Sequence, residues 1–465
     1  MKICLLNDSF APVIDGVVNV VTNYANYLTA DHDAEVIVGT PRYPDADYSV
    51  YPYRIVPYQS FDTTAVTNGY RTGNPFTGKS VAELAGFAPD IIHTHCPASS
   101  TIMARILREQ VDAPIVFTYH TKYDIDIGRA VKSRLAARES IRAMVNNIEA
   151  CDDVWVVSRG AGESLKALGF QGEYRVMNNG VDFEKGRVDP ESVAEVTRDY
   201  DLPDGVPVFL FVGRMMTYKG LPMILDALKL LSDAGQDFRM VFVGKGPDRG
   251  LLEQKASGLG IMGKCIFTGP VYDRDALRAW NTRADLFLFP STFDTNGLVV
   301  REAAACGLAS VLIDGSCAAE GITDGRNGFI IQQTPEAMAA LLGRVCGDLD
   351  HLQAVGAHAM DEIYLSWRDC VSSAYDRYRD VLEEKRRGML PKKKKLPADY
   401  LVSLAARSME KQERLRCLSR ELFNDFRETA VGMMEIIQEA EENLGHLLDR
   451  VSDDIHLGHG SSRKG

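Results

Sequence analysis

The sequence predicts an α/β protein in which two doubly wound domains face a common cleft and a helical C-terminal extension follows. Short β-branched or aromatic runs alternate with helical stretches through both halves, which is typical of parallel strands joined by covering helices. At 465 residues the chain is too long for one hydrophobic core. It is 45% hydrophobic, and no apolar run approaches the roughly 20 residues that a membrane span needs.

The first half is expected to form a domain over residues 1–182. The alternation predicts strands at 2–7, 34–39, 53–57, 90–95, 114–119, 152–157 and 174–177. It predicts helices between several of them, at 16–30, 98–110, 131–150 and 160–168. The polar residues 183–206 interrupt this pattern and are expected to be the linker.

The second half repeats the alternation over residues 207–365. Its strands are expected near 207–212, 239–243, 265–268, 285–289 and 309–313, and its helices at 219–234, 247–259, 273–283 and 297–306. A further helix, 366–387, begins around Trp367, and residues 388–465 form the extension. Two doubly wound domains would hold a ligand at the carboxyl ends of their strands, in the cleft.

Two acidic side chains flank a helix start in the second domain. Asp294 precedes Asn296, Gly297 and Leu298, and Glu302 follows them. Gly297 allows a tight turn, and the free N–H groups of the first helical turn attract phosphate. Carboxylates beside phosphate would repel it unless they bind hydroxyl groups. Phosphate together with a polyhydroxyl group describes a nucleotide sugar.

This segment resembles the Glu-x7-Glu signature of the family 4 retaining glycosyltransferases, which have the GT-B fold of two Rossmann-like domains. Asp294 stands where the family has its first Glu, and Glu302 stands at the second. The resemblance implies that Asp294 contacts the donor sugar and Glu302 the ribose, with Asn296, Gly297 and Leu298 also at the donor. The alternative is an ordinary amphipathic helix with an acidic N-terminal turn.

Three further motifs occur in the family's order. Residues 208–220 resemble its Gly-Arg…Lys-Gly element, which implies that Arg214 and Lys219 hold the diphosphate, a suitable pair of cations for that group. Asn179-Gly-Val-Asp182 resembles the motif after the last strand of the family's first domain. Near the N-terminus, a turn leads to Gly16, which would bring the backbone close to the donor phosphates. In the same fold, a helix such as 366–387 returns to the first domain.

The acceptor side is expected from the first half, where polar residues end two buried strands. His93-Thr-His95 and Thr118-Tyr-His-Thr-Lys-Tyr-Asp124 resemble segments of the bacterial glycosyltransferases that act on diacylglycerol. The resemblance implies that His120 faces the donor sugar and that His95 lies on the acceptor side. The alternative is a strand-end histidine bonded to backbone. No acidic residue has zincin-like spacing to these histidines, so we expect no metal site and no cofactor. A loosely bound divalent ion is not required by the motifs.

Charge and cysteine content narrow the class of protein. The net charge of −12 argues against nucleic-acid binding. Nine cysteines, an odd number without C-x-x-C spacing, favour reduced cytosolic thiols. Arg134, Arg138 and Arg142 recur at helical spacing beside apolar residues, which suits either an anionic membrane surface or a solvated helix face.

The extension has two oppositely charged parts. Residues 385–416 carry 11 Lys and Arg against 3 Asp and Glu, and include Lys392, Lys393, Lys394 and Lys395. Such a basic segment predicts attraction to an anionic leaflet. Residues 417–454 are acidic, and Met433, Ile437, Ala440, Leu444, Leu447 and Val451 follow a/d spacing. This stripe could pack on the body, on the basic segment, or on a second chain in a homo-oligomer.

These observations predict a peripheral glycosyltransferase at the cytoplasmic face of the cell membrane. It would move a hexose, glucose from a UDP-linked donor, to a lipid hydroxyl, 1,2-diacylglycerol, in glycolipid synthesis. No enzyme nucleophile is evident, so the expected route is front-face attack with retention. Three alternatives stay open: transfer to a soluble polysaccharide or small-molecule acceptor, a nucleotide-sugar epimerase of the same fold, and a catalytically silent binding subunit.

Overall fold

The computed structural model describes residues 1–13, 15–64, 69–123, 127, 133–391, 399–400 and 402–412. By its internal contacts the chain divides into Met1–Val402 and Ser403–Gly465. Residues 403–412 of the second unit are helical. The basic run Lys392 to Lys395 and the acidic segment 417–454 lie outside the described residues, so the roles expected for them stay predictions.

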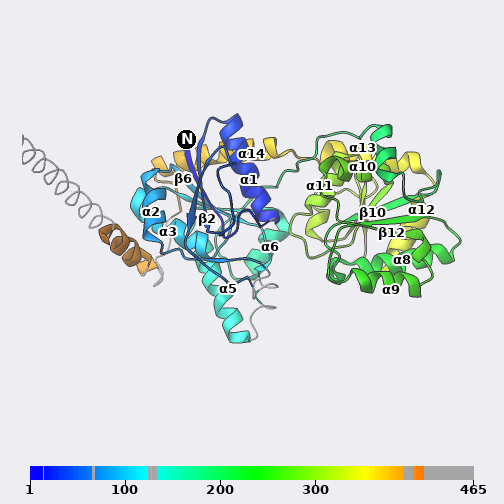
Figure 1. Cartoon of the computed structure of the whole chain (residues 1–465), viewed down its shortest axis with the longest axis horizontal. Coiled ribbons are helices and arrows are strands. Elements are labelled where there is room, and N and C mark those ends of the chain that lie inside the picture. The colour runs from blue at the N-terminus through cyan, green and yellow to red at the C-terminus, as the bar shows by residue number, and fades with distance from the viewer. Residues whose placement is uncertain are drawn as a thin grey trace, which may run out of the picture. The chain divides into compact units, whose positions relative to one another are not determined.

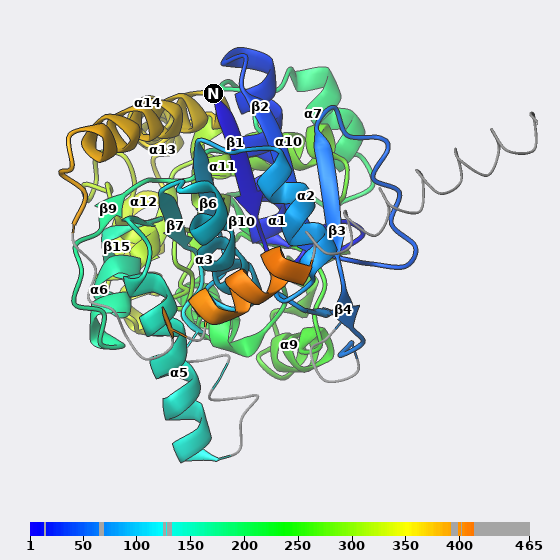
Figure 2. The same ribbon diagram turned by 90° about the vertical axis from the view of Figure 1, so that its left-hand side faces the viewer.

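A seven-stranded sheet forms the centre of the N-terminal domain, with the order β3-β2-β1-β6-β7-β8-β9 and parallel pairing throughout. The strands are β1 (Lys2–Leu6), β2 (Glu35–Pro41), β3 (Arg54–Tyr58), β6 (Ile91–Thr94), β7 (Ile115–Tyr119), β8 (Asp153–Val156) and β9 (Arg175–Val176). The helices of this domain are α1 (Gly16–Asp31), α2 (Gly78–Gly86), α3 (Ser99–Val111), α5 (Arg134–Glu149) and α6 (Arg159–Ala167). A small antiparallel pair, β4 (Ser60–Phe61) and β5 (Thr72–Gly73), stands apart from the sheet (Figure 2).

The C-terminal domain has a six-stranded parallel sheet of order β12-β11-β10-β13-β14-β15 (Figure 1). Its strands are β10 (Val208–Val212), β11 (Arg239–Val243), β12 (Cys265–Gly269), β13 (Leu286–Phe289), β14 (Ser310–Ile313) and β15 (Phe329–Ile331). Its helices are α8 (Leu221–Asp233), α9 (Arg249–Gly258), α10 (Arg274–Arg283), α11 (Leu298–Ala305), α12 (Pro335–Val345) and α13 (Leu349–Glu362), with short 3-10 turns η1 (Thr217–Lys219), η2 (Met262–Lys264) and η3 (Cys317–Ala319). The two sheets confirm the predicted α/β class.

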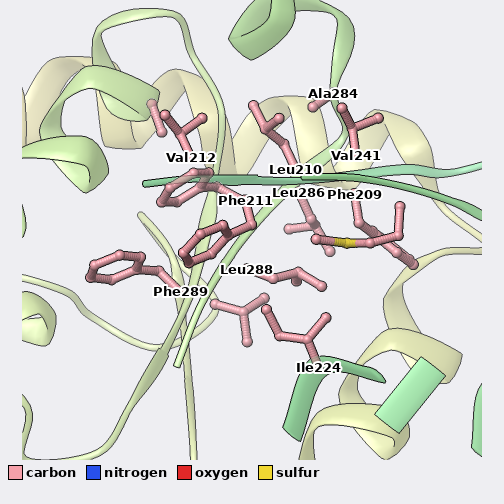
Figure 3. Packing of buried hydrophobic residues seen from close by; sticks show 14 of the residues in the cluster. Phe209, Leu210, Phe211, Val212, Ile224, Val241, Ala284, Leu286, Leu288 and Phe289 are labelled. Atoms are coloured by element: carbon pink, nitrogen blue, oxygen red, sulfur yellow. The ribbon is translucent and has the colours of Figure 1, made fainter. Parts of the chain in front are cut away.

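The strands of this second sheet are continuous apolar runs because they are buried in the core of the domain. Every residue of β10 is buried, and Phe211 stacks on Phe289 with ring centroids 6.1 Å apart (Figure 3). Ile224 of α8 packs in the same cluster (Figure 3). Helices cover both faces of a parallel sheet, so a polar side chain in mid-strand would have no water to contact. The apolar strand interiors therefore leave polar residues only at the strand ends.

The segment expected to be a linker has structure of its own. Helix α7 (Pro190–Thr197) lies within 183–206, starts with Asp189 as its cap, and packs on α10. Just after it, Tyr200 meets the ring of Trp280 at 5.1 Å. An Asp-Pro pair is a standard helix start, and this signal could have identified α7 in the sequence.

Helix α14 (Trp367–Arg386) belongs to the core of the N-terminal domain. Trp367 and Tyr378 are buried in one cluster with residues of β1 and α1. Arg377 donates to Asp153 of β8 at 2.7 Å. Among the described residues, no helix is long and apolar enough to cross a bilayer.

The Asn179-Gly-Val-Asp182 motif has a packing role where the chain leaves the N-terminal sheet. Val181 N donates to Leu365 O at 2.9 Å, and Val181 pairs with Ser366 in a short parallel bridge. A Cβ on Gly180 would overlap the backbone of Ser366 and Trp367. Glycine therefore allows the two chain segments to approach each other at this point.

We expect Gly180→Ala to lower the free energy of unfolding by about 1–3 kcal/mol, because the backbone at the start of α14 must move. Gly258→Ala is the matched control, since a Cβ there would meet nothing within 4 Å in helix α9. That control should be neutral or stabilising by up to about 1 kcal/mol. Urea unfolding of both variants tests this, and equal stabilities for the two would contradict the packing role.

Candidate active site

A cleft of about 640 Å³ lies at the carboxyl ends of the strands of both sheets. The N-terminal domain lines it with residues that follow β1 and β7, and the C-terminal domain with residues that follow β10 and β13. The residues expected to bind the donor or react are found here in large part: Gly16, His120, Lys219, Asp294, Asn296, Gly297 and Leu298. This is the position at which doubly wound sheets bind ligands, because buried strands end there in polar loops.

The start of helix α11 forms one wall. Gly297 has φ 63°, and a Cβ there would lie 2.9 Å from that of Ala318, so both backbone conformation and packing require glycine. Asn296 donates to Val157 O of the N-terminal domain. Among the described residues, no hydrogen-bond partner contacts its buried Oδ1. The free N–H groups of this helix end suit an anionic ligand.

Lys219 and Asp294, to which the sequence assigned separate contacts, touch each other. Lys219 Nζ lies 2.9 Å from Asp294 Oδ1, and Ser291 Oγ donates to the other carboxylate oxygen at 2.5 Å. Gly220 positions the lysine: it has φ 82°, and a Cβ would lie 2.8 Å from Pro290 O. The two side chains therefore place one positive and one negative charge in the cleft, and each holds the other in position.

Arg214 and Glu302 lie outside this lining. Arg214, after β10, is exposed to solvent. Glu302 accepts from Arg274 at 2.7 Å, and Arg274 also lies 3.5 Å from Asp182 and 4.5 Å from the Phe183 ring. Burial raises the pKa of Glu302, while Arg274 opposes that shift. The diphosphate role of Arg214 and the ribose role of Glu302 stay predictions.

The opposite wall comes from the start of helix α1. Asp15 caps this helix, accepting from Val17 N and Val18 N at 2.8 Å, and Ser9 Oγ donates to it at 3.1 Å. A Cβ on Gly16 would meet nothing within 4 Å. Packing therefore does not require glycine here, and the open space beside the backbone is available to a ligand.

Sequence reasoning missed several residues on this wall, including Asp8, Tyr70 and Arg71. Asp8 accepts from Ser100 N at 2.6 Å, and burial raises its pKa to about 6. Asp8 directly follows a buried strand, a signal that could have identified it. Tyr70 and Arg71 precede the short strand β5, which carries no such signal.

His93, His95 and His120, which the sequence places at the ends of two buried strands, form a buried stack of rings. His93 contacts Tyr378 Oη at 2.6 Å and Thr118 Oγ1 at 2.7 Å, so both its ring nitrogens are engaged. His95 Nδ1 lies 3.1 Å from His120 Nε2, and those rings stack at 5.3 Å. Burial lowers the pKa of His120 to about 3 and holds the pKa of His93 and His95 well below normal. The stack is therefore neutral at pH 7.

Metal binding has no support in this geometry. His93 has no ring nitrogen left for a metal ion, since both are bonded to hydroxyl groups. Within the described part of the chain, no three His, Cys, Asp or Glu side chains gather in a way that could hold an ion. The expectation of a metal-free site stays a prediction.

Loop residues join the two walls directly. Thr295 Oγ1 donates to His120 O at 2.6 Å, and Ser158 Oγ donates to Thr295 O at 2.5 Å. The side-chain carboxylate of Glu320 accepts from Arg159 N and Gly160 N at 2.7 and 2.5 Å. A residue of the C-terminal domain therefore caps helix α6 of the N-terminal domain. These contacts set His120 opposite the start of α11, and the sequence did not predict them.

Arg134, Arg138 and Arg142 lie together on helix α5, away from the cleft. They line a separate shallow hollow with Ile141. Leu135 is 70% exposed beside them. Helix α5 therefore combines cations with exposed apolar surface, as the sequence predicts.

Two family models match consecutive parts of the chain. Residues 14–185 match the model described as Glycosyltransferase Family 4, and residues 193–359 match Glycosyl transferases group 1. Together with the two facing sheets and the cleft, these matches define a glycosyltransferase of the GT-B fold. The chain belongs to the family 4 glycosyltransferases and is a hexosyltransferase.

Curated relatives are similar over most of the chain. Sulfoquinovosyl transferase SQD2 of Arabidopsis thaliana is 26% identical over 360 residues, covering 75% of this chain and 67% of the relative. Alpha-monoglucosyldiacylglycerol synthase of Streptococcus pneumoniae is 24% identical over 317 residues, covering 66% and 70%. A GDP-mannose-dependent alpha-(1-6)-phosphatidylinositol dimannoside mannosyltransferase of Mycobacterium tuberculosis is 28% identical over 322 residues, covering 69% and 79%.

Solved structures support the fold. Anabaena HepE in complex with UDP superposes with a TM-score of 0.66 at 17% identity, covering 82% of this chain and 100% of that one. Sucrose-phosphate synthase from Thermosynechococcus elongatus gives a TM-score of 0.64 at 19% identity, covering 82% and 99%. The predicted GT-B fold is confirmed.

We expect Asp294→Ala to weaken binding of UDP-glucose much more than binding of UDP, because the resemblance to the family assigns its carboxylate a contact with the donor sugar. Lys219→Ala and Glu302→Ala should weaken both ligands, the first on the order of tenfold or more, since each would contact the nucleotide part. Calorimetry with UDP and UDP-glucose measures these affinities. Equal losses for both ligands in Asp294→Ala would remove the assigned sugar contact.

The buried histidines predict acid sensitivity. Their folded-state pKa values lie below the unfolded value of about 6.5, so the unfolded chain binds more protons as pH falls below that value. Stability is then fully present above about pH 6.5 and is lost on acidification, by about 1.4 kcal/mol per pH unit and histidine. Asp8, with its raised pKa, offsets part of this loss between about pH 4 and 6.

Urea unfolding at pH 7 and 5.5 tests this expectation, and His120→Gln should lose less stability than the wild type over that interval. His358→Gln is the control, because His358 is exposed on helix α13. Identical pH dependence of the wild type and His120→Gln would show that folding does not lower the pKa of His120.

Proposed function

We propose that this enzyme transfers glucose from UDP-glucose to the hydroxyl of 1,2-diacylglycerol or a related lipid, with retention, at the cytoplasmic face of the cell membrane. The observation that carries the proposal is the cleft in which the Lys219–Asp294 pair and the free start of helix α11 face His120 and Gly16. A cation and a helix N-terminus suit a diphosphate, and a carboxylate suits sugar hydroxyls.

The uridine part of the donor is supported by a structural neighbour, since HepE was solved with UDP and with UDP-glucose. The pair formed by Glu302 and Arg274 adds a carboxylate on the α11 side. When a donor binds, its phosphates would compete with Asp294 for Lys219. The carboxylate would then be released to accept from sugar hydroxyls.

The transfer step follows from the charges in the cleft. The acceptor hydroxyl attacks the anomeric carbon from the face that the nucleoside diphosphate leaves, the sugar–phosphate C–O bond breaks, and the departing phosphate oxygen takes the hydroxyl proton. Lys219 and Arg214 would stabilise the charge that develops on the leaving group. His120 is neutral, and His95 engages its Nε2, so it would contact a ligand hydroxyl through Nδ1 rather than act as an acid.

The lipid acceptor is supported by relatives and by helix α5. The named activities of the curated relatives include a monoglucosyldiacylglycerol synthase and a mannosyltransferase of phosphatidylinositol dimannoside. The arginines on α5 and its exposed Leu135 suit contact with an anionic bilayer surface. Figures 1 and 2 show α5 extending beyond the neighbouring elements of its domain.

A soluble acceptor is the alternative favoured by other neighbours of the same fold, sucrose-phosphate synthase and starch synthase IV. Those likenesses lie at low identity and concern the fold. A soluble-acceptor enzyme would also leave the arginines of α5 without a function.

Incubation of the full chain with a panel of nucleotide sugars, with and without diacylglycerol in anionic vesicles, tests the proposal. We expect transfer with UDP-glucose that depends on the lipid. The triple variant Arg134→Gln, Arg138→Gln, Arg142→Gln should lower vesicle binding and lipid transfer by about tenfold or more, because each basic residue near an anionic leaflet contributes about 1 kcal/mol. Donor hydrolysis should change little, since α5 does not line the cleft.

The control is Arg198→Gln with Arg344→Gln, which removes two exposed arginines of the C-terminal half. This control should leave vesicle binding unchanged. Transfer to soluble sugars but not to diacylglycerol would favour the alternative, and release of an epimerised nucleotide sugar without acceptor would overturn the transferase assignment.

A further inference from the structure

A second cavity, of about 280 Å³, lies on the N-terminal domain beside the cleft. We call it the cationic pocket. It is lined by the side chains of Arg42, Arg71 and Lys79 and by Ser60, Thr77 and Ser80, together with Pro44, Pro57 and Gln59. Strand β3, strand β4 and helix α2 carry Pro57, Ser60, Lys79 and Ser80, and the other lining residues lie in the segments that adjoin these elements (Figure 2). Three cations converge on the pocket, and its lining includes no carboxylate.

The charge of the pocket is only partly compensated. Arg71 is held by Ser60, donating to Oγ at 2.9 Å and to the carbonyl at 3.4 Å, and it lies 3.4 Å from Asp62. Asp62 itself is 67% exposed, which weakens that pair. Among the described residues, no carboxylate pairs with Arg42 or Lys79. The side chains thus present more positive than negative charge to whatever enters.

The backbone adds to this attraction. Helix α2 starts at the pocket, and its cap residue Thr77 makes no side-chain bond to the first turn. The Thr77 hydroxyl donates instead to Asn74 O at 2.9 Å. The first N–H groups of α2 are therefore available beside Lys79 and Ser80. Guanidinium, ammonium and helix N–H groups together are the set that proteins use for phosphate.

The surroundings point to an amphiphile. Phe61 and Phe76 are the chain neighbours of the lining residues Ser60 and Thr77, and they are 54% and 52% exposed. Exposed phenylalanines beside a cationic pocket suit a ligand that has both an anionic and an apolar part. Arg71 lines this pocket and the cleft, so a headgroup bound here would lie next to the acceptor side of the reaction site.

We infer that the cationic pocket binds the phosphate of an anionic lipid headgroup beside the transfer site. The inference rests on the proposed transfer to a lipid, since that function would bring lipids to this part of the domain. It adds a phosphate-bearing lipid as a ligand beside the uncharged diacylglycerol. The same chemistry would accept inorganic phosphate, but only the lipid has an apolar part that could contact the exposed Phe61 and Phe76.

Calorimetry of the full chain with dihexanoyl phosphatidate below its micelle concentration, and separately with inorganic phosphate, tests the inference. We expect the lipid to bind more tightly than phosphate, and Arg42→Gln with Lys79→Gln to weaken the lipid on the order of tenfold or more. Arg71 stays unchanged because it also lines the cleft. The control Arg198→Gln with Arg344→Gln should stay within about twofold, as expected for remote surface charges.

UDP affinity, measured in the same variants, reports whether the cleft is intact, and Lys79→Gln alone replaces the double variant if that affinity is lost. Equal affinity for phosphate and phosphatidate would overturn the lipid assignment. The same conclusion would follow if the variant with Arg42→Gln and Lys79→Gln kept the affinity of the wild type for phosphatidate, or if the control lost as much affinity as that variant. These titrations measure binding and involve no sugar transfer. They can therefore succeed or fail independently of the test of glucosyl transfer.

Discussion

The contacts of one loop hold the active site together. Residues 291–297 follow the buried strand β13, and they carry Asp294 on one side and Thr295 on the other. Thr295 bonds to His120 O and accepts from Ser158, while Asp294 bonds to Lys219 and Ser291. The walls that the two domains contribute to the cleft are thereby joined through adjacent residues of one chain segment. If the two walls move relative to each other, the hydrogen bonds of Thr295 to the N-terminal domain must break or the loop must move with that domain.

Burial of the histidine stack shapes the chemistry next to that loop. A charged imidazolium would lose its hydration among Tyr24, Trp155 and Tyr378, whose rings surround His93 and His95. The histidines therefore stay neutral and serve as hydrogen-bonding groups. The charged side chains that line the cleft are Arg71, Lys219, Asp294, Asp15 and Asp8. This division suits a reaction in which a departing diphosphate, and not an enzyme acid, handles the proton.

Much of the fold could be predicted because strand interiors are apolar. Strands such as 207–212 and 285–289 lie within a residue of β10 and β13, and the Gly-Leu pair at 297–298 does start α11. Helix α7, the β4–β5 pair and the capping of α6 by Glu320 were not predicted. A two-residue strand has no periodicity to detect, and a cap supplied from 160 residues away leaves no local pattern.

The sequence by itself determined the fold class, the family and seven of the residues that line the cleft, because each depends on local order: apolar runs, glycines at positive φ, and polar residues at strand ends. Only the tertiary structure decided which of those residues meet. It paired Lys219 with Asp294, left Arg214 exposed, and placed Arg42, Arg71 and Lys79 around one pocket. Such pairings depend on distances between segments far apart in the chain, and no residue spacing along the sequence encodes them.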